Sequence, residues 1–419
     1  MSAERAAAVA RGGVVRVSAL ADGVLWLAVF LGGFVIFEPA PYELFLVAVI
    51  PVYFMAGLKI PRSVGPLLVC LICYVTGGLL STSQTGAPRF VDALVYVGVS
   101  LFLAISAVWY AALAADDWRR IRLIERAYVG TAVLVSLLGV AGYFRLVPDP
   151  DLFLLYGRAK STFQDPNVFG PFLILPSLVL ARRLMTGPIL TRPGTVLGLV
   201  ILVLGVFLSF SRAAWGMLAV GLPLLAAVVS ANFPTNRQRL RLVGIVVAGV
   251  ALLVVLIAVA ASIPAVYDIL VQRAKLVQDY DGKDGAELGR FARHWAGFML
   301  ATEKPFGIGP WEFDRLYIEA THNTYLKALM EYGWLGFVSY VTLVGFTLRR
   351  ALPLLWQPRP WQGFAQCLVV SFLLHMVVGW IIDTDHWRHF YLTFGLIWGL
   401  AAAEAAHRRA RPDRAAEPA

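Results

Sequence analysis

Charged residues are scarce in this chain. Only 15% of its 419 residues are Asp, Glu, Lys or Arg, whereas 59% are hydrophobic, and the mean hydropathy is +0.72. A soluble domain carries about 25% charged residues, so the composition excludes an ordinary soluble protein. Apolar runs long enough to cross a bilayer as helices recur throughout, without the alternating pattern of a transmembrane barrel. We therefore expect an all-α polytopic membrane protein.

Cysteine is also scarce, since the chain has only Cys70, Cys73 and Cys367. All three fall inside predicted spans, so no disulfide framework is expected. Cys70 and Cys73 have the spacing of a metal or redox pair, but thiols within a membrane helix more often act as small packing residues. A cleavable signal pattern is lacking at the N-terminus as well, and we expect the first span to remain as an anchor.

Positive charge is in excess, with a formal net charge of +10. Such a balance can indicate nucleic-acid binding. Here the arginines fall in short clusters between apolar runs, which is the pattern of cytoplasmic loops in membrane proteins. We therefore expect no nucleic-acid partner.

We predict one integral membrane domain over residues 1–418, with about twelve transmembrane helices and a large helical loop over 265–322. The predicted spans are 19–37, 42–58, 63–80, 91–115, 126–146, 167–181, 194–209, 212–231, 242–264, 323–348, 363–382 and 388–405. With the N-terminus in the cytoplasm, every cytoplasmic loop is basic. The charge pattern thus predicts that both termini are cytoplasmic.

Four polar segments then fall on the extracytoplasmic side, and each ends where a helix begins. They are residues 158–167, 209–212, 265–322 and 383–388. Helix N-termini attract anions, phosphate above all. Cationic side chains add to this at the same level, namely Arg158, Lys160, Arg212 and Arg388. The sequence therefore predicts anion binding at the extracytoplasmic face.

The loop 265–322 is too long to be a simple connector. Within it, residues 279–285 indicate a turn and residues 286–303 an amphipathic helix. Its apolar stripe consists of Leu288, Phe291, Trp295, Phe298 and Met299. The side chains of Arg290, Arg293 and His294 share another face. Such a helix can lie at the membrane interface with its arginines on a substrate head group or on bulk phospholipid. A Gly/Pro-rich turn follows over 304–310.

His322 stands at or beside the start of the span 323–348. The positive end of that helix favours the neutral imidazole, which is the form that a general base needs. The alternative is a histidine that only caps a membrane helix. Glu331, two turns further on, is expected to neutralise an arginine or to support helix packing. Gly333 and Gly336 are expected to allow close helix approach.

The pattern HNxYLxxxxExGxxG over 322–336 resembles the O-antigen ligase and O-antigen polymerase (Wzy-type) superfamily. Three further segments agree with this resemblance, in the same order and on the same side. They are the STFQDPN segment over 161–167, the pair Ser211–Arg212, and the arginine segment 290–295 before a KPxxGxG turn. The similarity covers residues 155–400.

The resemblance implies a membrane glycosyltransferase of the GT-C type in the bacterial inner membrane, with a periplasmic active site. Its substrates would be a glycan on undecaprenyl pyrophosphate and an acceptor glycan or glycolipid. His322 would deprotonate the acceptor hydroxyl, while Arg212 and Arg290 would hold the pyrophosphate. Contacts to substrate would come from Arg158, Lys160, Asn167, Ser211, Arg293, Asn323 and Arg388. No cofactor and no metal is implied.

Several alternatives stay open. Asp383 and Asp385 could hold Mg²⁺, although we interpret them as partners of Arg388 or His386. The activity is polymerisation of an O-antigen or exopolysaccharide, or ligation to lipid A–core; the compact loop favours polymerisation. A polysaccharide chain-length regulator is a candidate partner. The rival classes are a transporter, whose polar residues would lie near the bilayer midplane, and a scaffold or receptor, which needs no cationic helix starts.

Overall fold

The computed structural model of the chain describes residues 18–189, 191–263, 267, 271, 289–317 and 320–410. An apolar helix over Ser18–Leu31 comes first. The α-helices that follow are α2 (Pro41–Met55), α3 (Gly65–Thr82), α4 (Phe90–Asp116), α5 (Arg120–Tyr143), α6 (Pro166–Phe172), α7 (Ile174–Thr186), α8 (Pro193–Leu208), α9 (Arg212–Ala231), α10 (Asn236–Ala261), α12 (Arg290–Glu303), α13 (Glu312–Leu316), α14 (Thr324–Ala351), α15 (Gln362–Val378) and α16 (Arg388–Arg409). Short 3₁₀ turns are η1 (Arg62–Val64), η2 (Ala87–Arg89), η3 (Pro150–Phe153) and η4 (Leu352–Leu355).

The polytopic helical architecture is confirmed. In the described part of the chain, 6 helices are long and apolar enough to cross a membrane, and shorter apolar helices accompany them. The helices of the structure differ from the ranges of the predicted spans in several places. The first helix ends at Leu31 rather than at residue 37. The span 167–181 is two helices, α6 and α7, which meet at Leu173. The loop helix begins at Arg290, while residues 264–266, 268–270 and 272–288, which include the predicted turn over 279–285, lie outside the described residues.

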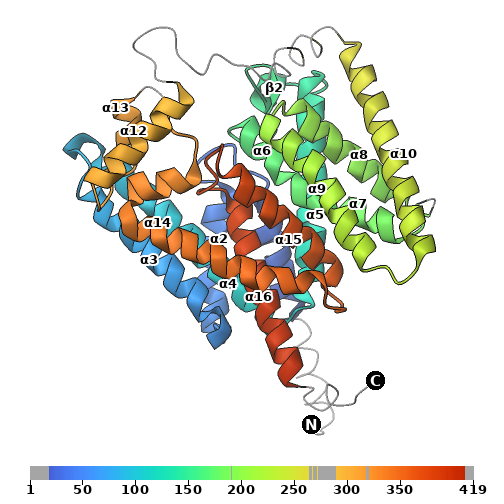
Figure 1. Cartoon of the computed structure of the whole chain (residues 1–419), viewed down its shortest axis with the longest axis horizontal. Coiled ribbons are helices and arrows are strands. Elements are labelled where there is room, and N and C mark those ends of the chain that lie inside the picture. Colours follow the sequence, from blue (N-terminus) through green and yellow to red (C-terminus); the bar gives the residue numbers. More distant parts are fainter. Residues whose placement is uncertain are drawn as a thin grey trace, which may run out of the picture.

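Two groups of helices lie side by side (Figure 1). On the left of that view are α3, α12, α13 and α14; on the right are α5 to α10, with α15 and α16 between them. The helix pairs α3–α14 and α4–α16 pack closely because small residues face each other. A Cβ atom on Gly77 of α3 would lie 2.7 Å from the backbone nitrogen of Gly336 on α14. Gly336 therefore acts as the predicted packing residue.

Gly333 has a different role from the one predicted. Its φ of 68° interrupts α14, and its space is taken by backbone rather than by another helix, since a Cβ there would lie 2.5 Å from the carbonyl carbon of Phe306. The turn 304–310 fills the break: Trp334 N–H donates to Pro305 O (3.0 Å) and Ile308 N–H to Met330 O (2.8 Å). The kink thereby ties the loop that follows α12 to the first half of α14.

A small hairpin departs from the all-α prediction within the described residues. The strands β1 (Leu154–Leu155) and β2 (Arg158–Ala159) pair antiparallel around Tyr156 and Gly157. Both turn residues have positive φ, 50° and 71°, as a tight two-residue hairpin turn requires. In Figure 1 this hairpin lies along the same upper edge as α12 and α13. Arg158 is thus held on a strand at that end of the molecule.

Candidate active site

His322 lies directly before the first helical turn of α14. The N-cap of this helix is Asn323, whose Oδ1 accepts from the N–H groups of Tyr325 and Leu326, both at 3.1 Å. His322 therefore stands beside the cap, as predicted, and does not itself cap the helix. Its φ is 50°. The left-handed region is unfavourable by about 1–2 kcal/mol for a residue with a Cβ, and such strain concentrates at functional sites.

Thr324 fixes this strained segment against the connection between α15 and α16. Its N–H donates to Gly379 O (2.8 Å) and its Oγ1 donates to Ile382 O (3.0 Å). Thr384 N–H donates back to Thr324 Oγ1 (2.8 Å). These three bonds join residues that are 55 to 60 positions apart. They hold the start of α14 next to the segment that carries Asp383.

Asp383 is the carboxylate that faces His322. Its Oδ2 lies 3.5 Å from Nδ1 of His322, whose side chain is 43% exposed. Oδ1 of Asp383 is buried and has no hydrogen-bond partner among the described residues. Of the two aspartates interpreted as partners of Arg388 or His386, Asp383 thus faces His322 instead. The pair places an accessible imidazole beside a carboxylate that needs a hydrogen-bond donor.

Asp385 is the centre of a buried network just behind this pair. Its Oδ2 accepts from Tyr96 OH (2.7 Å) on α4 and lies 2.9 Å from His386 Nδ1. The other ring nitrogen of His386 lies 3.0 Å from Ser100 Oγ. Burial raises the pKa of Asp385, but the charges of Lys327 and His386 and the hydrogen bonds from His386 and Tyr96 outweigh it, so the pKa lies well below its usual value. The predicted pairing of Asp385 with His386 is confirmed.

Lys327 supplies the positive charge within this buried group. Its Nζ lies 3.5 Å from Asp385 Oδ2 and 5.0 Å from the centroid of the Tyr96 ring. Asp314 on α13 belongs to the same group. Burial raises the pKa of Asp314, the charges of Lys327 and His322 oppose this rise, and the charge of Asp383 adds to it. Glu331 is buried one turn below Lys327. Its Oε2 lacks a hydrogen-bond partner among the described residues, and the cation whose charge acts on this carboxylate is Lys327 rather than an arginine.

The sequence analysis missed Lys327 and Asp314. A signal for Lys327 was present, because an ionisable residue inside a predicted span is unfavourable unless it has a partner, and Lys327 lies four residues before Glu331. Asp314 gave no comparable signal, since a carboxylate in a long polar loop is ordinary. We use the name His322 cluster for His322, Lys327, Asp383, Asp385 and His386.

A second group of predicted site residues meets at the starts of α6 and α9. Arg158 is buried, and its Nε donates to Ser209 O (3.0 Å) while NH2 donates to Asn167 Oδ1 (2.8 Å). Ser211 is the N-cap of α9, with its Oγ accepting from Ala214 N–H (3.4 Å). Arg212 is the first residue of that helix and is half-buried. Arg158 thus joins the hairpin to both helix starts.

The remaining predicted cations come from three parts of the chain, namely α12, the residue after β2 and the start of α16. Arg290 begins α12, and Arg293 is half-buried one turn later. The adjacent His294 donates from Nε2 to Thr321 O (2.7 Å), which links α12 to the residue before His322. Lys160 is half-buried directly after β2. Arg388 binds two carboxylates, Oε1 of Glu43 through Nε and Oε1 of Glu38 through NH2 at 3.2 Å.

A residue with a Cβ lies in the left-handed region in two of the segments on which the resemblance rests, and directly before a third. These residues are Ser161 (φ 52°), Phe210 (φ 46°) and His322 (φ 50°), and each lies a few residues before a helix. Ser161 is buried, and its Oγ donates to Val135 O at 2.5 Å. A bend of this kind turns the chain sharply from the end of the bundle into the next helix. These three turns thus help to form this end of the molecule.

Residues 197–341 match a family model described as O-antigen ligase, of the Wzy type. This segment of the polytopic membrane protein is similar to the O-antigen ligase family. This family transfers glycans in the manner of a ligase or a polymerase, with lipid-linked glycans as substrates. The match includes Arg212, Arg290, Arg293, His322 and Asn323, whereas Arg158, Lys160, Asn167 and Arg388 lie outside it. No curated protein matches the chain.

Proposed function

We propose that the protein polymerises polysaccharide repeat units by moving a glycan from undecaprenyl pyrophosphate to an acceptor sugar hydroxyl. The observation that carries this proposal is His322, strained, accessible and 3.5 Å from Asp383, in a segment shared with the O-antigen ligase family. A general base needs an accessible nitrogen and a partner that orients its ring. Both are present at this one residue.

The chemistry follows from which nitrogen is free. Asp383 faces Nδ1, so Nε2 would take the proton of the acceptor hydroxyl. The hydroxyl oxygen then forms a bond to the anomeric carbon of the donor glycan, while the bond between that carbon and the phosphate oxygen breaks. Asp383 would hold the neutral tautomer before transfer and stabilise the imidazolium afterwards, as carboxylate partners do in other histidine sites. The 3.5 Å contact would shorten on substrate binding.

The leaving group is undecaprenyl pyrophosphate, whose negative charge grows as the bond breaks. Arg212 and Arg290, each the first residue of its helix, would bind this pyrophosphate. At these positions guanidinium charge adds to the positive end of a helix. Arg293 and Lys160 would contact the phosphates or the acceptor, and Asn167, Ser211 and Asn323 would set the positions of neighbouring backbone. Arg158 would keep the starts of α6 and α9 together.

The basic loops favour an orientation in which the His322 cluster faces the periplasm and both termini face the cytoplasm of a bacterial inner membrane. Lipid-linked glycans are available on that side and nucleotide sugars are not. Both the polymerase and the ligase use such a donor, and they differ in the acceptor. The compact loop around α12 favours a second lipid-linked repeat unit as acceptor over lipid A–core.

Glycan output in a deletion strain tests this proposal. The strain is complemented with wild type, His322→Gln, Arg212→Gln or Arg290→Gln, and membrane insertion of each variant is measured. His407→Gln, in the last turn of α16, is the matched control. We expect inserted His322→Gln to leave short lipid-linked repeats without long polymer, and His407→Gln to restore polymer.

Other outcomes would contradict the proposal in distinct ways. Long chains that stay on undecaprenyl pyrophosphate and are missing from lipid A–core would identify a ligase. Normal polymer with His322→Gln would remove the general base. If short lipid-linked repeats collected on the cytoplasmic side of the membrane, the protein would be a transporter.

A further inference from the structure

A cavity lies at the end of the helix bundle opposite to the His322 cluster. It has a volume of about 200 Å³ and is formed by the start of α5, the end of α7 and the residues around the start of α15. Liquid water occupies about 30 Å³ per molecule, so the cavity has room for a phosphate group with its substituents. We use the name arginine pocket for Trp118, Arg122, Glu125, Arg182, Arg183 and Phe364.

The charge of the arginine pocket is unbalanced. Its lining contains three arginines and one carboxylate. Arg183 NH2 binds Glu125 Oε1 at 2.5 Å, and Arg182 Nε donates to Gln366 Oε1 at 2.8 Å. The guanidinium of Arg122 lies 5.8 Å from the centroid of the Trp118 ring. Within the described residues these contacts use only a few of the five N–H donors that each guanidinium offers, so the pocket is built for an anion.

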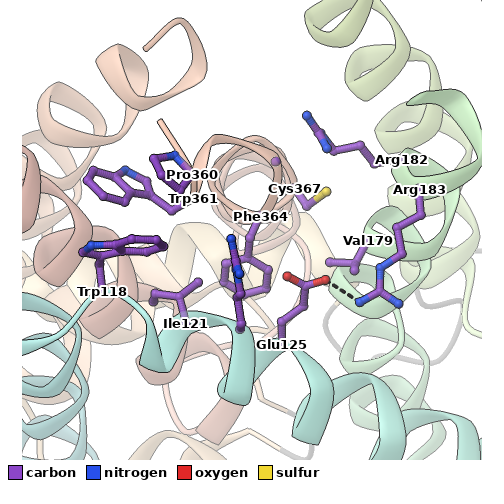
Figure 2. A pocket seen from close by; sticks show the side chains of 12 residues that line it. Trp118, Ile121, Glu125, Val179, Arg182, Arg183, Pro360, Trp361, Phe364 and Cys367 are labelled. Atoms are coloured by element: carbon purple, nitrogen blue, oxygen red, sulfur yellow. Dashed lines mark hydrogen bonds and ion pairs between the residues drawn. The ribbon is translucent and has the colours of Figure 1, made fainter. Parts of the chain in front are cut away.

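The other side of the pocket is apolar. Figure 2 shows the indole rings of Trp118 and Trp361 on one side and Arg182 and Arg183 on the other, with the ring of Phe364 between them. Trp361 is buried, and its centroid lies 5.2 Å from that of Trp118. A ligand here would meet guanidinium groups and an aromatic wall together. A fully hydrated small anion gains nothing from such a wall, whereas an amphiphile does.

The position of the pocket indicates the source of the ligand. It lies where α5 and α15 begin and α7 ends. The arginines in the connections at this end of the bundle favour its placement on the cytoplasmic side of the membrane. Anionic phospholipids are enriched on that side, and basic pockets between helices bind their head groups there. A lipid phosphodiester would reach Arg122 and Arg182 while its glycerol and first acyl carbons contact Phe364 and Trp361.

We propose that the arginine pocket is a specific site for the phosphodiester head group of an anionic phospholipid. This site is separate from the glycan-transfer site and does not depend on the activity assigned to it. A lipid that binds only the folded protein stabilises it. The bound lipid would join α5, α7 and α15, and α15 leads to the segment that bonds Thr324 beside His322.

Lipid binding to the purified full-length protein tests the proposal. Dissociation constants for phosphatidylglycerol and phosphatidylcholine are measured by native mass spectrometry, and the thermal unfolding midpoint is followed at the same lipid concentrations. We expect wild type to bind phosphatidylglycerol about tenfold more tightly, because the arginines repel the choline cation of phosphatidylcholine, which also offsets the charge of its phosphodiester. Arg122→Gln with Arg182→Gln is expected to remove this preference. The matched control is Arg126→Gln, an exposed arginine of α5 outside the pocket, and its preference should stay within twofold of wild type.

Glu125→Gln keeps the proposal testable if the double variant fails to fold. This change removes the carboxylate that occupies Arg183 and should tighten phosphatidylglycerol binding several-fold, which a general loss of structure cannot do. Equal binding of the two lipids by wild type, or an equal loss of preference with Arg126→Gln, would overturn the site. A shift of the unfolding midpoint by inorganic phosphate as large as that by the lipid would assign the pocket to a free anion instead.

Discussion

The two charged regions of this molecule are opposite in sign. The His322 cluster contains two aspartates beside two histidines and one lysine, with Asp314 and Glu331 close by. The arginine pocket contains three arginines and one glutamate. Carboxylates next to an imidazole suit a group that moves protons, whereas unbalanced guanidinium groups suit the binding of a phosphate.

This contrast explains why the predicted donor-binding arginines are not in the His322 cluster. A pyrophosphate next to Asp314, Asp383 and Asp385 would be repelled. Arg212 and Arg290 instead begin α9 and α12, on separate elements at the same end of the bundle. Under the proposed function, a division of this kind would keep the base among carboxylates and the leaving group among cations.

The largest expected effect is on transfer at His322. His322→Gln should lower the rate of glycan transfer by about 100- to 10,000-fold, which is the usual contribution of a general base. Asp383→Asn should lower it by about 10- to 100-fold, since the ring would keep its nitrogen and lose its orientation. Transfer from a purified lipid-linked glycan, measured per folded molecule, checks both changes.

The relative size of the two losses in transfer rate tests whether the carboxylates of the His322 cluster serve activity or stability. If Asp383→Asn had no effect on transfer, the carboxylates near His322 would serve stability alone. If both changes lowered the midpoint of thermal unfolding but left the transfer rate per folded molecule unchanged, the cluster would be structural throughout.

The sequence predicted the helices around His322 but few of the contacts between residues that are distant in the chain. Apolar runs located the helices, since burial in a membrane leaves a strong local signal. The pattern around His322 was sufficient to propose a candidate site because it is contiguous in the sequence. The partner of His322 was not predictable in this way: Asp383 reaches it only through bonds between Thr324 and residues 379–384, and such long-range contacts leave no local pattern.

Gly333 also shows that local sequence does not reveal long-range contacts. A glycine in a membrane helix is compatible with close packing and with a break in the helix, and composition does not separate the two. Arg388 was predicted as a substrate contact from its place at a helix start. The structure gives it two carboxylate partners, Glu38 and Glu43, from a segment more than 300 residues away.

The second effect in size is on stability at Lys327. Lys327→Met would leave Asp385 and Glu331 buried without their cation, and removing one partner of a buried ion pair destabilises by about 3–5 kcal/mol. The double variant Lys327→Met with Asp385→Asn should recover part of that loss, because the uncompensated charge is gone. Thermal unfolding in detergent measures both. A double variant less stable than the sum of the single changes would show that the pair is not the reason for the loss.

A third effect concerns the kink of α14. Gly333→Ala forces a Cβ onto the backbone of residues 305–307 at a φ of 68°, so we expect a loss of about 2 kcal/mol or more from strain and contact. Gly345→Ala in the same helix is the control, because nothing lies within 4 Å of its Cβ; it should be neutral or slightly stabilising. The unfolding midpoints of the two variants compare them directly. Equal midpoints would mean that the turn 304–310 moves aside without loss.

The smallest effect is expected where the geometry of an ion pair is good but the pair is open to solvent. Arg120 and Asp116 lie at the same end of the bundle as the arginine pocket, and Arg120 NH1 is 2.7 Å from Asp116 Oδ2, closer than Lys327 is to Asp385. The Asp116 side chain is 52% exposed, however, whereas that of Asp385 is 6% exposed. Exposed pairs of this spacing contribute about 0.3–0.5 kcal/mol, so Arg120→Met should change the unfolding midpoint far less than Lys327→Met does. If the two changes were equal in size, burial would not be the quantity that separates the two charged regions, and water would have to reach Asp385 in solution.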